Sequence, residues 1–161
     1  MTHTITAIVQ DHPGVLARVA GLFARRGFNI ASLSVNRTHR PGMSRMVICV
    51  DGDQLTLEQI TKQLHKLVEV LKVWDHVDDP VVQRELALIK VDADARTRSE
   101  IFQIATIFRA QIVDVSDRTV TIECTGLTDK IDALVRMLEP FGIKETARTG
   151  RVILVRGFQD T

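Results

Sequence analysis

The order of segments between residues 4 and 30 constrains the fold of this chain more than any other feature. Residues 4–10 are rich in β-branched side chains and predict a strand, and Asp11-His12-Pro13-Gly14 is typical of a tight turn. A helix is expected over residues 14–26, with Asp11 as its N-cap and Pro13 where its missing N–H has no intrahelical partner. A glycine then ends the helix before the next strand. The chain therefore begins as strand, turn, helix and strand.

The rest of the first half extends this order to βαββαβ. Residues 30–37 alternate apolar and polar side chains, as a half-buried strand does, and further strands are expected at Arg45–Asp51 and Val70–Val77. A second helix is expected over Leu57–Glu69. It carries one apolar stripe, made of Leu57, Ile60, Leu64, Leu67 and Val68.

A second, weaker copy of the same order follows. Its expected strands are residues 85–92, 112–116, 119–125, 143–147 and 152–156, and its expected helices are residues 98–109 and 129–138. Asp78-Asp79-Pro80, running on to Arg84, reads as the linker between the two copies. We therefore predict an α+β chain of two domains, residues 1–78 and 79–161, each with helices on one face of an antiparallel sheet.

The run Met46-Val47-Ile48-Cys49-Val50 has apolar side chains on both faces of its strand. Helices cover only one face of so small a sheet, so the apolar side chains on the other face would be exposed to solvent. Pairing of sheet edges or faces between two chains would cover them, so we expect a homodimer.

Charge and composition argue against several classes of protein. The 21 basic and 20 acidic residues are interspersed, which does not favour binding to nucleic acid or to an anionic membrane. The expected strands 4–10 and 45–51 lack the aromatic residues on which RNA-binding sheets stack bases. No apolar run approaches the roughly 20 residues that span a bilayer, so we expect a soluble, cytoplasmic protein. Cys49 and Cys124 lie in apolar runs and are expected to be buried thiols.

Recognisable catalytic and metal-binding patterns are absent from the sequence. The five histidines show neither HxxxH nor HExxH spacing, and there is no GxGxxG, P-loop or GxSxG motif. His12 lies beside the turn but is expected to be an exposed turn residue. One possible ligand site is the helix start, where the N–H groups of Gly14, Val15 and Leu16 would attract an anion such as a carboxylate. Most helix N-termini, however, bind only water.

The run Asp11–Val19, followed by Gly21–Val35, resembles the opening of an ACT domain. More narrowly, it is similar to the regulatory (small) subunits of acetohydroxyacid synthase, also called acetolactate synthase. The similarity covers essentially the whole chain. It continues through Thr38, residues 44–46, 57–60 and 62–68, Glu85-Leu86, Glu100, and residues 108–115 and 147–150. The resemblance implies an N-terminal ACT domain and a related C-terminal domain, both ferredoxin-like βαββαβ sandwiches.

The resemblance implies a regulatory role without catalysis. Subunits of this family bind and activate a catalytic subunit and confer feedback inhibition by valine or another branched-chain amino acid, in branched-chain amino acid biosynthesis. Thiamine diphosphate, magnesium and FAD would belong to that catalytic partner, and this chain is expected to bind no cofactor or metal. A free-standing, amino-acid-sensing ACT protein with another partner is the alternative. A small ferredoxin-like enzyme such as a phosphatase is a third possibility.

The resemblance also implies where the effector lies, namely between the first turn of one protomer and the second strand of another. The implied site residues are Asp11, Pro13, Gly14, Val15, Leu16, Asn29 and Ile30. Backbone N–H groups near Gly14 would hold the α-carboxylate, Asn29 would bridge ammonium and carboxylate, and apolar side chains would shape the pocket. The family usually has Asn where this chain has Asp11. Because the Asp11 charge would repel the effector carboxylate, we expect a weaker or altered valine response.

Overall fold

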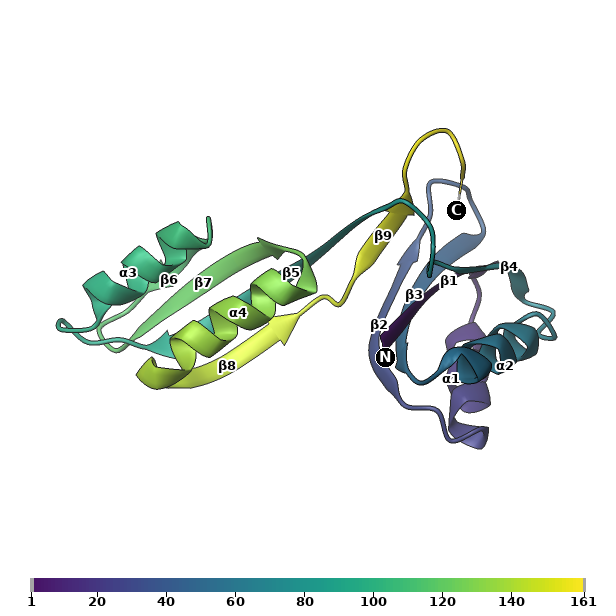
Figure 1. Ribbon diagram of the computed structural model, residues 1–161, viewed down its shortest axis with the longest axis horizontal. Helices are drawn as coiled ribbons and strands as arrows, with labels where there is room; N and C mark the ends of the chain where they lie inside the picture. The colour runs from purple at the N-terminus through teal and green to yellow at the C-terminus, as the bar shows by residue number, and fades with distance from the viewer. Residues whose placement is uncertain (1, 161) are drawn as a thin grey trace. The chain divides into compact units, whose positions relative to one another are not determined.

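A computed structural model describes residues 2–160, and the chain folds into two units (Figure 1). Unit 1 runs to Val82 and resumes at Arg151, whereas unit 2 is Gln83–Gly150. The sequence predicted domains 1–78 and 79–161. The structure differs at both ends of the second range, because residues 79–82 and those from 151 onward group with unit 1. No helix in the described part of the chain is long and apolar enough to cross a bilayer.

Unit 1 contains a four-stranded antiparallel sheet in the order β2-β3-β1-β4, with two helices on one face (Figure 1). The elements are β1 (Thr2–Gln10), α1 (Val15–Arg25), β2 (Ile30–Arg37), β3 (Met43–Asp51), α2 (Gln54–Leu64) and β4 (Val70–Asp75). The predicted βαββαβ order of the first half is therefore confirmed.

The core of unit 1 lies between the sheet and its helices. Alternate residues of the two central strands face the helices and are buried: Ile5, Ala7 and Val9 from β1, and Met46, Ile48 and Val50 from β3. Helix α2 contributes Leu57, Ile60 and Leu64. This helix ends five residues earlier than predicted, because i→i+3 turns at Lys66 and Leu67 follow it. The predicted stripe is wrong at Val68, whose side chain is 83% exposed.

The opposite face of this sheet is covered by the end of the same chain. We call Arg151–Val155 the C-terminal segment. Arg151 donates from Nη1 to the Thr4 hydroxyl (3.0 Å), and Arg45 donates from Nη1 to the carbonyl of Ile153 (3.3 Å). Every second residue of a strand lies on the same face, so Arg45 shares its face of β3 with Val47 and Cys49. The C-terminal segment, which contacts Arg45, therefore crosses the face that carries Val47 and Cys49.

The burial of this face changes one argument made from the sequence. Val47 and Cys49 are each 3% exposed in a single chain, and Ile153 of the C-terminal segment is 4% exposed. A second chain is therefore not needed to bury both faces of β3, and the physical reason given for a homodimer is wrong. The homodimer itself stays a prediction.

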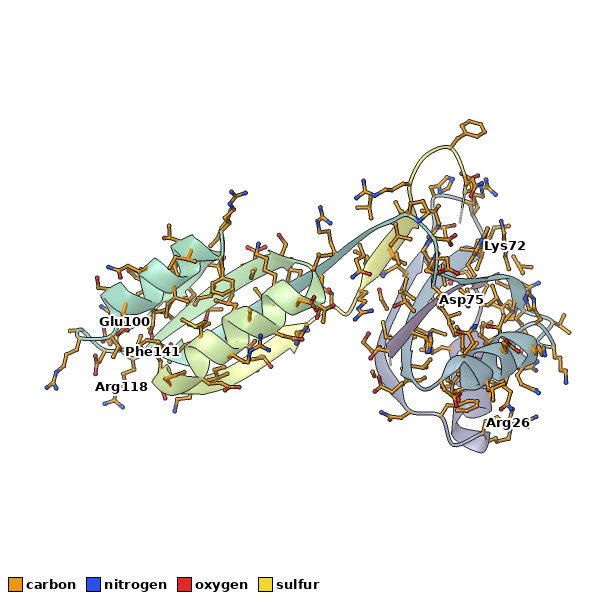
Figure 2. The ribbon with its side chains drawn as sticks, in the orientation of Figure 1. Arg26, Lys72, Asp75, Glu100, Arg118 and Phe141 are labelled. Carbon is orange, nitrogen blue, oxygen red and sulfur yellow. The ribbon has the colours of Figure 1, made fainter. Side chains whose placement is uncertain are left out.

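Unit 2 repeats the plan of unit 1 with the sheet order β6-β7-β5-β8. Its elements are β5 (Val81–Asp92), α3 (Arg98–Ile107), β6 (Gln111–Val115), β7 (Thr119–Gly126), α4 (Thr128–Leu138), the 3-10 turn η1 (Glu139–Phe141) and β8 (Ile143–Arg148). Its core contains Ile89, Ile122 and Ile131, and Phe141 packs against it (Figure 2). Strand β5 begins at Val81, within unit 1. The last strand, β9 (Val152–Val155), also belongs to unit 1 and pairs with β5, and Arg156 donates from its backbone N–H to the carbonyl of Pro80. The predicted α+β class, with two tandem sandwiches, is confirmed.

An ion-pair cluster around the buried carboxylate of Glu85 joins three elements of unit 2. Glu85 of β5, whose side chain is 6% exposed, contacts Nε of Arg148 at 2.5 Å and accepts a hydrogen bond from Thr128 at 3.1 Å. Arg148 of β8 also contacts Asp132 of α4 at 2.7 Å. The hydrogen bond with Glu85, followed by that with Asp132, raises the pKa of Arg148 above its ordinary value. The cluster therefore fixes β5, β8 and α4 to one another.

Introducing a charge at Ile153 is expected to detach the C-terminal segment and expose Cys49. Burying a carboxylate without a partner is unfavourable, so Ile153→Asp should raise the rate of Cys49 modification by a thiol reagent about tenfold or more. The measurement uses a Cys124→Ser background, in which Cys49 is the only thiol. Leu154→Asp is the matched control, because Leu154 is 57% exposed on the same segment. Equal rates in both variants would contradict the expected role of Ile153.

Removing the arginine that pairs with the buried Glu85 is expected to destabilise unit 2. Arg148→Met leaves the Glu85 carboxylate buried without its cation, which costs about 3 kcal/mol. Hydrogen exchange of the β5 and β7 amides measures this loss within unit 2. Lys90→Met is the control, because the Lys90–Glu145 pair is largely exposed (3.4 Å) and contributes at most about 1 kcal/mol. A similar loss in both variants would show that burial of Glu85 is unimportant.

Candidate functional site

The turn between β1 and α1 contains most of the predicted site residues. Gly14 is the N-cap of α1 and has φ +90° and ψ −14°, a left-handed conformation that favours glycine. No side chain caps this helix, so the prediction that Asp11 is the N-cap is wrong. Pro13 precedes the N-cap and lies outside the helix. The left-handed glycine reverses the chain immediately before α1, which is why the helix begins at Val15.

The surface of this turn is open in the single chain. A Cβ atom added at Gly14 would meet no atom within 4 Å. Pro13 and Leu16 are exposed, the latter to 45%, whereas Val15 is buried in the core of unit 1. The first turn of α1 carries no acidic side chain. Its N–H groups and the positive end of the helix dipole therefore meet an uncrowded surface where a small carboxylate can approach.

Asp11 lies beside the turn but is held by the neighbouring hairpin. Its Oδ2 atom is 2.8 Å from Nε of Arg37, and its Oδ1 atom accepts a hydrogen bond from the Ser44 hydroxyl (3.2 Å). Its backbone N–H donates to the carbonyl of Gly42 (2.9 Å). Arg37 and Ser44 pair across β2 and β3. These partners could not be predicted from the sequence, because only the register of the hairpin brings them to Asp11.

A buried carboxylate anchors the start of α1 on its other side. Arg18, one turn into the helix, contacts Oε1 of Glu69 at 2.5 Å. The carbonyl of Glu69 also accepts from the backbone N–H of Gln10, at the end of β1. These contacts connect the strand before the turn and the helix after it to the same residue. The turn is thus held from two sides, which favours a fixed geometry for its N–H groups.

Asn29 and Ile30 lie at the far end of the sheet from the turn. Ile30 pairs with Val50 on β3, whereas Gln10, next to the turn, pairs with Met43. Seven residues of extended strand separate these two positions, a distance of roughly 20 Å. Asn29 is exposed and Ile30 is partly buried. One chain therefore does not bring Asn29 to Gly14, and only a second copy of the chain could combine them in one site.

The polar groups at this turn are suited to binding a ligand. His12 is exposed and its Nε2 atom lies 2.9 Å from Oε1 of Gln10, so it has the surroundings of a turn residue. Among residues 2–160, no group of three or more His, Cys, Asp or Glu side chains is arranged to hold a metal ion. An exposed helix start with polar neighbours suits a small zwitterion such as an amino acid.

Both halves of the chain match family models of one kind of protein. Residues 5–72 match the ACT domain of acetohydroxyacid synthase small subunits and their like. Residues 84–157 match a model described as the small subunit of acetolactate synthase. The resemblance identified in the sequence is thereby confirmed over both halves.

Individual relatives match over nearly their full length. The acetolactate synthase small subunit of Mycolicibacterium smegmatis is 54% identical over 156 residues, which cover 97% of this chain and 92% of that protein. The probable acetolactate synthase small subunit of Archaeoglobus fulgidus is 53% identical over 157 residues, 98% of each. The crystal structure of the acetolactate synthase small subunit from Thermotoga maritima matches with a TM-score of 0.88 and 46% identity, over 99% of both chains.

Alanine at two glycines of unit 1 is expected to change stability in opposite directions. Gly14→Ala forces a left-handed conformation on a residue with a Cβ atom, which destabilises the fold by about 1 kcal/mol or more. Gly21→Ala in the interior of α1 should stabilise it by up to about 1 kcal/mol. The new Cβ at Gly21 meets only the end of the flexible Arg25 side chain, at 3.4 Å. Thermal unfolding measures the stability of both variants. A similar loss of stability in both would contradict the conformations assigned to the two glycines.

Proposed function

This chain belongs to the family of acetolactate synthase small subunits, and from this premise we propose that it activates the catalytic subunit and confers feedback inhibition by a branched-chain amino acid. Valine is the proposed effector. The observation that carries the proposal is the open turn at Gly14, where α1 begins with no side-chain cap and no acidic residue in its first turn.

The proposed effector site combines two copies of the chain. The α-carboxylate of the amino acid binds the N–H groups at the start of α1, and the exposed side chain of Leu16 supplies part of an apolar wall. Asn29 and Ile30 come from a second protomer, in which Asn29 bridges the ammonium and carboxylate groups. The distance between the turn and Asn29 within one chain supports a site of this kind.

Inhibition follows from linkage between the effector and the dimer. An amino acid that contacts two protomers favours the arrangement of the dimer in which both contacts exist. It inhibits the catalytic subunit only to the extent that it binds this arrangement more tightly than others. The buried Glu69, which connects β1 to α1 through Arg18, provides a route by which the site affects the rest of unit 1.

Catalysis belongs to the large subunit in this proposal. Thiamine diphosphate, magnesium and FAD bind there, and this chain contributes no residue to them. The cytoplasmic location also stays a prediction from the sequence. A free-standing amino-acid sensor remains the alternative function. The family match over residues 84–157 disfavours it, because a sensor of another enzyme does not need the second domain of these subunits.

Titration of this chain into the cognate catalytic subunit is expected to raise the rate of acetolactate formation, and valine is expected to reverse the increase. Activation that valine leaves unchanged would support the subunit role and contradict the effector. No activation would contradict the proposed function and favour the free-standing sensor.

A pair of variants at Gly14 separates the effector site from the partner surface. Gly14→Asp places a negative charge at the proposed carboxylate site and should abolish valine inhibition while leaving activation largely intact. Gly14→Asn is the matched control, because it has the same shape and both residues tolerate the left-handed conformation. Loss of activation together with inhibition in both variants would indicate a folding defect instead.

A further inference from the structure

Asp11 is the acidic residue closest in the sequence to Gly14 of the proposed effector site. All three of its described polar contacts, to Arg37, Gly42 and Ser44, come from the hairpin formed by β2 and β3. None comes from α1, whose N-terminus it does not cap. The Asp11 carboxylate is thus fixed on the hairpin beside the turn, and its electrostatic effect on the turn depends on what neutralises it there.

Arg37 is the cation that opposes this charge. Its Nε atom is 2.8 Å from Oδ2 of Asp11, and the two side chains are 84% and 30% exposed. Asp11 is the less solvated partner, so water alone screens its charge incompletely. An ion pair this exposed adds little to the stability of a fold. A contribution to the stability of the hairpin therefore does not by itself explain why Arg37 lies against Asp11.

We propose that Arg37 is a specificity-determining residue of the effector site, which neutralises Asp11 so that the turn accepts the carboxylate of an amino acid. The inference rests on the proposed function, because it concerns the same site. Without Arg37, the Asp11 charge faces a second carboxylate bound at the start of α1. With Arg37 in place, the net charge beside the helix N-terminus is close to zero, and the helix dipole and N–H groups determine the binding.

Arg40 of the same hairpin provides a matched control. It forms an ion pair with Asp160, with Nη2 and Oδ2 3.5 Å apart and side chains 61% and 83% exposed. Arg40→Gln removes the same unit of charge from the same hairpin as Arg37→Gln but leaves the Asp11 contacts in place. A general effect of protein charge on valine binding would therefore be equal in the two variants.

Calorimetric titration of valine into the full chain tests the proposal. Arg37→Gln is expected to raise the Kd about tenfold, Arg40→Gln less than about twofold, and Arg37→Lys should retain most of the affinity. In an Asp11→Asn background, Arg37→Gln should change the Kd by less than about threefold, since no charge remains to be neutralised. Thermal unfolding checks that Arg37→Gln and Arg40→Gln are equally folded.

Two outcomes would overturn the inference while the proposed function stands. One is an unchanged Kd for valine in Arg37→Gln. The other is a loss of valine affinity on Arg37→Gln that is equally large in the wild-type and the Asp11→Asn backgrounds, because Arg37 would then act independently of Asp11. A wild-type chain that binds none of valine, leucine and isoleucine would overturn the effector site itself, and this inference with it.

Discussion

Burial of both faces of β3 is the constraint on which unit 1 depends. A four-stranded sheet with two helices buries one face only, and β3 carries apolar side chains on both. The helices cover Met46, Ile48 and Val50. The C-terminal segment covers Val47 and Cys49, next to the contacts made by Arg45 and Arg151. Unit 2 is consequently an insertion between two parts of unit 1, although the sequence reads as two consecutive copies of one pattern.

The direction of the strands determines what the candidate site requires. Because β1 and β2 are both antiparallel to β3, they run parallel, and the end of one lies far from the start of the other. The helix start at Gly14 can bind a carboxylate by itself, but the ammonium and side chain of an amino acid need further partners. A site divided between two chains, as we propose, would respond to assembly, which suits a regulatory subunit.

The order of elements could be predicted well from the sequence, because each element has a local pattern of apolar and polar residues. Alternation in β2 and the stripe on α2 depend on residues close in the chain. Strand β2 has the bounds expected, whereas α2 begins at Gln54 and ends at Leu64, three and five residues earlier than expected. The misses are long-range. The partners of Asp11, the cover over Cys49 and the return of residues 151–160 to unit 1 depend on contacts between residues 26 to more than 100 positions apart. No pattern within a short window reports such contacts.

The contact between Arg45 and Ile153 spans 108 positions, and this has a consequence for how the protein is made. During synthesis, the strands and helices from β1 to β4 emerge before unit 2 but lack the residues that cover their sheet. Unit 2, whose residues are continuous, can finish folding before them. The ACT domain therefore leaves the ribosome before unit 2 does, but it is completed only when the C-terminal segment follows. In the interval, its bare sheet face is where a chaperone would bind or where aggregation would begin.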